Sequence, residues 1–187
     1  MNQEQTDEAL LRLYSMGEAA AFESLYQRYR GSLYRYFRRQ CQDDSASEEM
    51  FQDVWMSVIR GSKQYQPDAL FKTWLYRIAH NRLVDYYRRQ SVTTAVMQAE
   101  TVINEDTLAH ENQRQPEAEE IARQRQRQLL QQISLLPIDQ RDAFLLHEEA
   151  GLSMEQIGEV MAVGKETAKS RVRYAVDKLR AGMKEWL

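Results

Sequence analysis

The sequence has few of the residues that shape turns, with only 7 Gly and 3 Pro among 187 residues. A β-sandwich or barrel needs a turn every 8 to 12 residues or so, and such turns draw on Gly and Pro. Helix-forming Ala, Leu, Glu, Gln and Arg dominate almost from end to end. The composition therefore predicts an all-α protein.

The sequence also lacks paired cysteines, since Cys41 stands alone and excludes an internal disulfide. Cys41, His80, His110 and His147 do not fall at ligand spacing, so we expect no metal. No apolar run approaches the roughly 18 residues of a membrane span, and residues 1–8 are too polar for a signal peptide. We expect a cytoplasmic protein without membrane insertion.

Catalytic motifs are missing as well. No nucleophile–base pair, phosphate-binding glycine loop or metal-ligand set can be found in the sequence. We therefore expect no enzymatic activity and no cofactor.

Charge is segregated along the chain, although the formal net charge is only −3. Two stretches, 71–90 and 165–184, are rich in Lys and Arg, and an acidic segment from Glu100 to Glu120 separates them. Phosphates respond to the local field of a patch, not to the average charge of a protein. Two separate nucleic-acid contacts are compatible with this pattern.

Apolar periodicity divides the chain into two helical domains. Residues 1–90 contain expected helices over about 7–16 and 18–41, a third helix that follows a capping turn at 43–45 and stops near Gly61, and a fourth over 70–89, with a loop at 62–69. Periodicity is lost in residues 91–116, which we interpret as a flexible acidic linker. Residues 117–187 contain expected helices over about 117–135, 137–150, 153–161 and 165–186.

The second domain ends in a predicted helix-turn-helix from Ser153 to Tyr174. Ser153 and Gln156 form a capping box, and residues 162–164 form the turn. The second helix of such a motif enters the DNA major groove, where Arg and Lys pair with guanine edges. A solvated amphipathic helix is the alternative. The expected DNA-binding residues are Lys165, Thr167, Lys169, Ser170, Arg171 and Arg173.

The most informative run is Phe71 to Arg89. Phe71, Trp74, Leu75 and Ile78 form one apolar face at helical spacing. A second face carries Arg77, Asn81, Asp85 and Arg88, which can hold phosphates and contact base edges. Tyr65 in the preceding loop can stack on unpaired bases. A solvated lattice of i,i+4 charge pairs is the alternative for the second face.

This run resembles the promoter-binding helix of bacterial sigma factors, specifically the small extracytoplasmic-function group of the sigma-70 family. The family pattern is an aromatic and a basic residue, Thr-Trp-Leu, Ile-Ala, Asn, Asp and a pair of Arg. Residues 48–55 (Glu-Glu-Met-Phe-Gln-Asp-Val-Trp) resemble the family's surface for the polymerase clamp helices. Residues 135–179 resemble its fourth region, so the resemblance covers nearly the whole chain outside the linker.

The resemblance implies a factor that gives core RNA polymerase its promoter specificity, promotes DNA melting at a signal-specific regulon and catalyses nothing itself. Its implied partners are the clamp helices of the largest polymerase subunit, the flap of the second-largest subunit, promoter DNA and an anti-sigma factor.

The resemblance also assigns roles to residues. The loop 62–70, with Asn81, would bind bases of the opened minus-ten element. Residues 165–173 would dock in the major groove of the minus-thirty-five element. The residues expected at the minus-ten element are Lys63, Tyr65, Lys72, Arg77, Asn81, Arg82, Arg88 and Arg89. The residues expected to bind polymerase are Glu48, Glu49, Gln52, Asp53 and Trp55.

The chain departs from the family pattern in the helix-turn-helix. Ala162 stands where the family usually has Gly, and the run 164–168 (Gly-Lys-Glu-Thr-Ala) replaces a Ser cap followed by Gly-Thr-Val. Gly is an acceptable cap, so the fold is not affected. A glutamate in the first turn does leave the identity of the upstream element open.

Two other classes of protein account for parts of this sequence. A ligand-sensing helix-turn-helix regulator would bind a two-fold symmetric duplex without polymerase, and it leaves residues 71–89 unexplained. A helical adaptor has no use for two separated basic patches. A further hypothesis is that the acidic linker shields the basic helices, so that deleting residues 98–117 raises the DNA affinity of the isolated factor.

Overall fold

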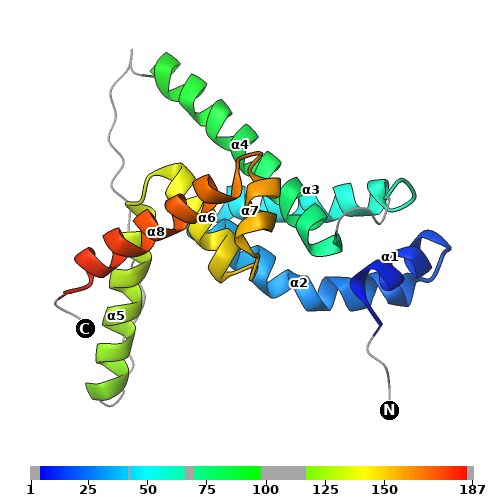
Figure 1. The fold of residues 1–187 in the computed structure, drawn as a ribbon, viewed down its shortest axis with the longest axis horizontal. Helices are drawn as coiled ribbons and strands as arrows, with labels where there is room; N and C mark the ends of the chain where they lie inside the picture. The colour runs from blue at the N-terminus through cyan, green and yellow to red at the C-terminus, as the bar shows by residue number, and fades with distance from the viewer. Residues whose placement is uncertain (1–4, 42, 66–69, 98–116, 185–187) are drawn as a thin grey trace.

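The computed structural model describes residues 5–41, 43–65, 70–97 and 117–184, and all regular structure in them is helical. The amino-terminal half comprises α1 (Asp7–Ser15), α2 (Ala19–Gln40), α3 (Asp44–Gly61) and α4 (Phe71–Met97). The carboxy-terminal half comprises α5 (Glu117–Ser134), α6 (Ile138–Glu148), α7 (Met154–Val160) and α8 (Lys165–Gly182). Figure 1 shows their arrangement. The all-α prediction is confirmed.

Helices α2, α3 and α4 form the body of the amino-terminal half, and α1 packs on α2 and α4 at one end. Two of these helices begin where the sequence supplies a cap, because Thr6 and Asp43 accept bonds from the backbone N–H groups of Ala9 and Ala46. The apolar stripe of α2 faces the core, with Leu25, Leu33 and Phe37 fully buried.

The carboxy-terminal half is built around the helix-turn-helix. The predicted capping box is present: the Ser153 hydroxyl accepts from the Gln156 N–H, and the Gln156 side chain accepts from the Ser153 N–H. Ile157, Ala168 and Val172 are buried between α7 and α8. Helix α6 packs on α8, while α5 projects from the body.

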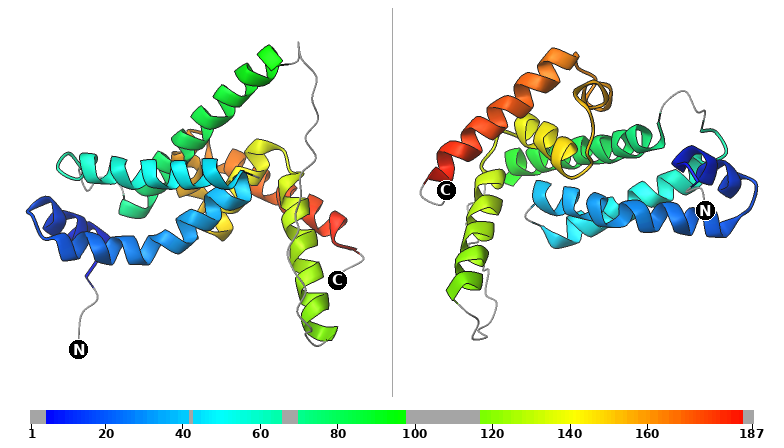
Figure 2. Two further views of the ribbon diagram at one scale, coloured as in Figure 1. Left: turned by 180° about the vertical axis from the view of Figure 1, so that it is seen from behind. Right: turned by 60° about the horizontal axis from the view of Figure 1, so that its bottom comes forward.

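The two halves contact each other directly. Helix α6 packs against α2, and α7 packs against α4, as the views of Figure 2 also show. The buried apolar residues of both halves form a single cluster. The sequence indicated two domains but did not predict that they pack together.

Helix α4 is longer than predicted, because it runs through Met97 while the expected linker begins at residue 91. The β-branched residues Val92, Thr93 and Thr94 cost only a few tenths of a kcal/mol each in a helix. Adding residues to an existing helix avoids the cost of a new nucleus, so the helix continues through them. The rest of the predicted linker, residues 98–116, lies outside the described residues.

Candidate nucleic-acid interface

Helix α4 presents the predicted polar face. Arg77 and Asn81 are exposed one helical turn apart, and Asp85 follows at the next turn. Arg88 is exposed and its guanidinium lies 3.8 Å from the Asp85 carboxylate. The prediction that these four side chains share a face is confirmed, and the face offers both donors and acceptors to a nucleic acid.

Two of the predicted minus-ten contacts are engaged within the protein. The Lys72 ammonium donates to the backbone carbonyl of Gly151, in the other half of the chain, at 3.1 Å. Burial lowers the pKa of Lys72. Arg82 is half-buried and donates to the Ser57 hydroxyl of α3 at 3.3 Å. Each of these cations keeps further N–H donors beside its present bond, so a phosphate contact can add to it.

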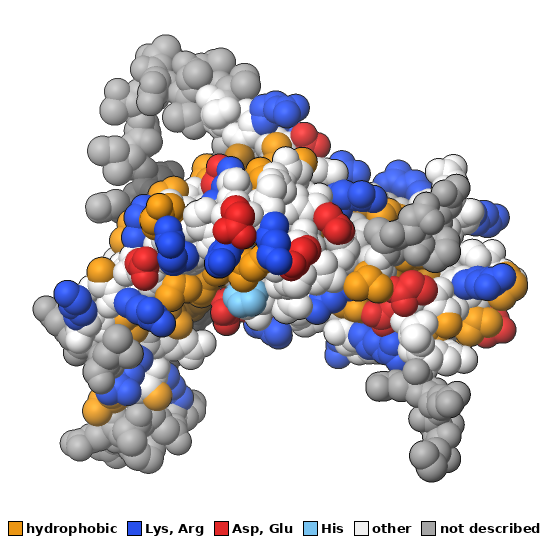
Figure 3. Space-filling view, in the orientation of Figure 1, with side chains coloured by type: hydrophobic (Ala, Val, Ile, Leu, Met, Phe, Trp, Pro, Cys, Tyr) orange, Lys and Arg blue, Asp and Glu red, His pale blue; other side chains and the backbone are white. Residues whose placement is uncertain are grey.

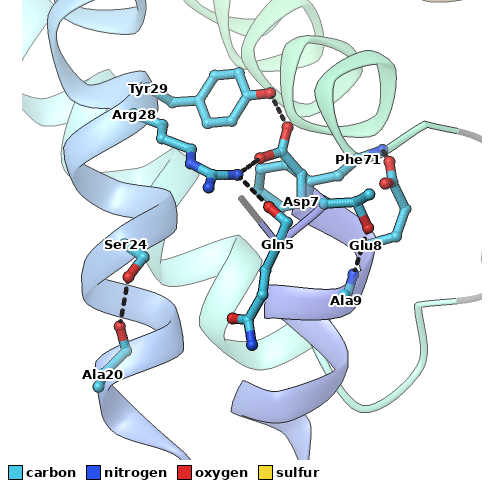
Figure 4. Close-up of polar contacts among 10 residues, drawn as sticks. Gln5, Asp7, Glu8, Ala9, Ala20, Ser24, Arg28, Tyr29 and Phe71 are labelled. Atoms are coloured by element: carbon cyan, nitrogen blue, oxygen red, sulfur yellow. Dashed lines mark hydrogen bonds and ion pairs between the residues drawn. The ribbon is translucent and has the colours of Figure 1, made fainter. Parts of the chain in front are cut away.

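The amino end of α4 is held by α1 (Figure 4). The Glu8 carboxylate accepts a hydrogen bond of 2.9 Å from the Phe71 N–H, one of the free donors at the start of the helix. Next to it, the Asp7 carboxylate accepts from Arg28 at 2.7 Å and from the Tyr29 hydroxyl. Helix α1 thereby fixes the position at which the loop before α4 ends.

A groove lies beside this loop, between α1 and the end of α3. Its volume is about 710 Å³, and Leu13, Met16, Lys63 and Tyr65 are among its lining residues. The Tyr65 ring packs against Trp74 with centroids 5.1 Å apart, and burial raises its pKa to about 12. The structure thus brings Lys63 and Tyr65 together, while residues 66–69 of the predicted base-handling loop lie outside the described residues.

Helix α8 exposes most of the side chains predicted to bind the upstream element. Thr167, Lys169 and Arg173 are exposed. Lys165 forms an ion pair with Glu155 of α7, and carboxylates and cations lie side by side over α7 and the start of α8 in Figure 3. Thr167, Lys169 and Arg173 thus lie on the outer surface of α8, as the sequence pattern predicts.

Two of the predicted contacts on α8 have partners inside the protein. Arg171 is 24% exposed and binds Asp139 of α6 at 2.7 Å. The Ser170 hydroxyl donates to the Glu166 carbonyl of its own helix. These bonds support a structural role for Arg171 and Ser170 alongside any contact with DNA.

Tyr174 is an addition to the predicted interface. Its ring is 49% exposed, and the Arg173 guanidinium lies 5.0 Å from the ring centroid. The sequence pattern places Tyr174 on the outer surface of this helix, next to the predicted DNA contacts, and the observed exposure agrees with that placement.

The turn of the helix-turn-helix is tight. Ala162 has a positive φ of 53°, the conformation that favours Gly. A Cβ added to Gly158 would lie 2.8 Å from the Val163 carbonyl oxygen. The close approach of α7 to the turn therefore depends on Gly158, while Ala162 adopts its conformation at a cost.

The predicted polymerase surface on α3 is mostly exposed. Glu48, Glu49 and Gln52 are exposed and Asp53 is half-buried. Trp55 is different, because it is only 5% exposed and packs against Phe22 and Tyr26. The prediction that Trp55 contacts polymerase conflicts with this burial: the apolar periodicity of α3 turns the side chain into the core.

The described residues give no indication of a metal site, since they contain no group of three or more His, Cys, Asp or Glu side chains that could hold an ion. Within the same part of the chain, no helix is long and apolar enough to cross a membrane.

Comparison with known proteins gives two family matches. Residues 25–93 match Sigma-70 region 2, and residues 126–179 match Sigma-70, region 4. The chain is 31% identical over 179 residues to the ECF RNA polymerase sigma-E factor of Haemophilus influenzae, covering 92% of each chain. It is 29% identical over 164 residues to the RNA polymerase sigma factor CarQ of Myxococcus xanthus, covering 88% of this chain and 90% of CarQ.

Two solved structures share the fold. CnrH, in a complex with the cytosolic domain of CnrY, matches with a TM-score of 0.70 and 20% identity over 97% of this chain and 99% of CnrH. The sigma factor RpoE of Bartonella quintana, in a complex with the anti-sigma factor NepR, matches with a TM-score of 0.70 and 20% identity over 87% and 96%.

Proposed function

Because the chain belongs to the extracytoplasmic-function group of sigma-70 factors, we propose that three separate surfaces bind the two promoter elements and the polymerase. The polar face of α4 and the adjoining groove bind the opened minus-ten element, α8 binds the minus-thirty-five element, and α3 binds core RNA polymerase. The protein is a promoter-specificity factor and not an enzyme. The polymerase supplies the phosphodiester chemistry.

The observation that carries this proposal is the pair of exposed helix faces in the two matched regions. Arg77 and Asn81 lie on α4 in the first region, and Thr167, Lys169 and Arg173 lie on α8 in the second. Each face alone gives modest, salt-sensitive affinity. Polymerase fixes the distance between the two faces so that both elements are bound together, which raises the overall affinity.

At the minus-ten element, the factor captures unstacked bases. Asn81 offers an amide that can donate to and accept from a base edge, and the groove beside Tyr65 can receive a flipped base. Stacking on an aromatic ring is worth about 1–3 kcal/mol per base, comparable to the few kcal/mol that unstacking costs. Arg77, Arg88 and Arg89 contact the strand backbone.

At the minus-thirty-five element, the first turns of α8 enter the major groove. Thr167, Lys169 and Arg173 supply the base and phosphate contacts, and Tyr174 adds an apolar surface for a thymine methyl group. Glu166 can accept from the amino group of a cytosine, which favours an upstream element containing that base at the matching position.

Polymerase is bound at two places. Glu48, Glu49 and Gln52 on α3 bind the clamp helices of the largest subunit through charge and hydrogen bonds. The flap of the second-largest subunit binds the apolar side chains exposed on and after α5, which are Ile121, Leu129, Leu130, Leu135 and Ile138. These two contacts set the distance between the DNA-binding helices.

We further infer a cytoplasmic location, where the promoters and the polymerase are, and control by an anti-sigma factor. The second inference rests on the fold shared with the sigma factor that was solved with the anti-sigma factor NepR. The rival class, a ligand-sensing regulator, has no role for the α4 face or for the acidic end of α3.

Run-off transcription with purified core polymerase tests the proposal on a library of promoter fragments. We expect defined transcripts only when the factor is present. Asn81→Ala should reduce them about 10- to 100-fold, because a lost base contact costs about 1–3 kcal/mol. Gln52→Ala should reduce them by weakening the polymerase contact. Gln27→Ala, an exposed change on α2, is the matched control and should have no effect.

The opposite result would be sequence-specific binding to a duplex in the absence of polymerase, with no transcripts in its presence. That result would assign the chain to the class of conventional regulators.

A further inference from the structure

A polar cleft lies at the edge of the contact between the two halves. Its volume is about 470 Å³, and it is lined by side chains of α1, α2 and α4 and by the segment that follows α6. Asp7, Arg28, Tyr29, Lys72 and Glu149 are among the lining residues. Of these five, only Lys72 is assigned above to promoter DNA, so the promoter contacts leave most of this cleft without a role.

Buried hydrogen bonds between the halves hold the walls of the cleft in place. The carboxylate of Asp142 on α6 accepts from the Tyr36 hydroxyl at 2.6 Å and from the Gln40 amide at 3.0 Å, both on α2. Nδ1 of His80 on α4 lies 2.6 Å from the same carboxylate. Because these bonds fix α6 against α2 and α4, the lining of the cleft is preorganised, which lowers the cost of binding a small ligand.

The two carboxylates that line the cleft already have cationic partners. The Asp7 carboxylate accepts from the Arg28 guanidinium at 2.7 Å, as Figure 4 shows. Glu149 forms an ion pair of 2.8 Å with Arg35 and a second ion pair with Arg39, both on α2. Each carboxylate therefore repels an incoming anion less than an unpaired carboxylate would.

Lys72 differs from the other cations of the cleft, because no carboxylate of the described residues forms an ion pair with its ammonium. The ammonium donates to the backbone carbonyl of Gly151 at 3.1 Å. Burial lowers the pKa of Lys72, and the nearby charge of Asp7 offsets this effect only in part. An ammonium has three N–H donors, so two of them remain for an acceptor bound in the cleft.

The space beside the Lys72 ammonium depends on Gly151. This glycine has a φ of 59°, in the left-handed region that favours Gly. A Cβ added at this position would lie 3.3 Å from Nζ of Lys72. A side chain at residue 151 would therefore crowd the ammonium at the edge of the cleft.

The lining of the cleft, counted with its direct ion-pair partners, carries an excess of positive charge. The cations are Arg28, Arg35, Arg39 and Lys72, and the carboxylates are Asp7 and Glu149. Four cations against two carboxylates leave two positive charges uncompensated, although the whole chain has a net charge of −3. A local positive field of this kind attracts anions.

We propose that this cleft binds a small phosphorylated metabolite of the sugar-phosphate class, with its phosphate group at Lys72. A phosphate monoester carries a charge of about −1.5 to −2 at pH 7, which matches the excess in the cleft, whereas each phosphate of a nucleic-acid strand carries only one charge. The volume falls within the range of about 300–1,000 Å³ that is typical of small-molecule sites. The Gln5 amide and the Ser32 hydroxyl also line the cleft and suit a body rich in hydroxyl groups.

Isothermal titration calorimetry of the full-length factor tests the proposal without polymerase or DNA. The probes are ribose 5-phosphate, ribose and inorganic phosphate, all at one ionic strength because salt screens exposed charges. Ribose 5-phosphate should bind at one site about 10-fold more tightly than inorganic phosphate, since its hydroxyl groups add hydrogen bonds, and ribose should not bind. Equal affinities for ribose 5-phosphate and inorganic phosphate, or no binding of either, would overturn the proposal.

Lys72→Gln locates the phosphate group. The variant loses the charge but keeps a side chain that can donate to the Gly151 carbonyl, so it should bind ribose 5-phosphate about 10- to 100-fold more weakly. Lys178→Gln makes the same change in charge at an exposed position of α8 outside the cleft, and it should bind like wild type. A Kd that Lys72→Gln leaves unchanged would overturn the proposal.

Glu149→Gln tests the charge of the cleft in the opposite direction. Removing one of the two carboxylates raises the positive excess and releases N–H donors of Arg35 and Arg39, so ribose 5-phosphate should bind about 3-fold or more tightly than to wild type. Weaker binding by a variant that keeps its helical circular dichroism would contradict the charge argument. Lys72→Gln supplies the decisive comparison if Glu149→Gln loses that signal.

The calorimetric result is independent of the proposed promoter function, because neither DNA nor polymerase is present. A factor that binds ribose 5-phosphate through Lys72 yet directs no transcription would refute the proposed function and leave the site standing. A factor that directs transcription but binds none of the three probes would refute only the site.

Discussion

Ala162 illustrates how one residue departs from the conformational preference of its position. Its φ of 53° lies in the left-handed region, where an L-residue places its Cβ close to the backbone. The cost is about 1–2 kcal/mol for a non-glycine residue. The turn nevertheless forms, because the packing between α7 and α8 stabilises it and the Val163 N–H donates to the Gly158 carbonyl at 2.9 Å.

Ala162→Gly should stabilise the protein. Glycine removes the steric cost but adds about 0.5–1 kcal/mol of chain entropy to the unfolded state, so we expect a net gain of about 0.5–1 kcal/mol in the free energy of unfolding. Urea denaturation measures it. Ala181→Gly, an exposed change near the end of α8 with no such positive φ, is the control and should destabilise. Equal losses in both variants would show that Ala162 carries no strain.

At the scale of the element, α1 stabilises the start of α4. It buries Leu10 and Leu11 in the core, and Glu8 accepts from the first N–H of α4. An unbonded N–H at a helix start is costly when it is withdrawn from water. A short helix far away in the sequence therefore positions the helix that we propose binds the minus-ten element.

Glu8→Ala should lower the free energy of unfolding by about 1 kcal/mol, because it removes this cap. Glu18→Ala is a matched control, since Glu18 occupies the N-cap position of α2 but makes no capping bond with its side chain. It should change stability by less than about 0.5 kcal/mol. Thermal denaturation of both variants measures the difference. Equal effects of the two substitutions would contradict the claim that Glu8 stabilises the start of α4.

Elements with local signals could be predicted from the sequence. The capping box at Ser153 and Gln156, the turn at 162–164 and the polar face of α4 all depend on residues within a few positions of one another. The carboxyl end of α4 was missed because the apolar residues after position 91 show no helical periodicity in the sequence. Trp55 was misassigned because residues 48–55 alternate between surface and core within one motif.

At the scale of the whole molecule, the arrangement of the halves rests on contacts between residues far apart in sequence. Tyr36 and Asp142 are separated by 106 positions, and neither is among the residues for which the sequence predicted a role. A polar residue on an amphipathic helix is normally solvated, so nothing local marks Gln40 or Asp142 as buried. The domains could be predicted, but their contact could not.

The buried tyrosines make global stability sensitive to alkaline pH. Burial, with the Asp142 carboxylate, raises the pKa of Tyr36 well above its usual value, and burial raises the pKa of Tyr76 to about 12. The unfolded chain ionises near pH 10. Because the raised pKa favours the neutral phenol in the folded state, the stability is present below about pH 10 and is lost as pH rises toward 12.

Tyr76→Phe should reduce this sensitivity. Between pH 9 and pH 11.5 the wild type should lose about 2 kcal/mol more than the variant, which follows from about 1.4 kcal/mol per pKa unit. Urea denaturation at the two pH values gives the difference. Tyr34→Phe, a change at a 40% exposed ring, should behave like wild type, and a wild-type loss no greater than that of Tyr76→Phe would contradict the prediction.

The placement of Asp142 has a consequence for hybrid factors assembled from two parents. A chimera that joins α5–α8 of this chain to the amino-terminal half of another protein keeps the contact only where that half supplies donors at the positions of Tyr36, Gln40 and His80. Where it does not, the buried carboxylate of Asp142 loses its hydrogen bonds, and the hybrid is destabilised even though each of its parts is intact. Grafting the three donors together with α5–α8 would restore the contact.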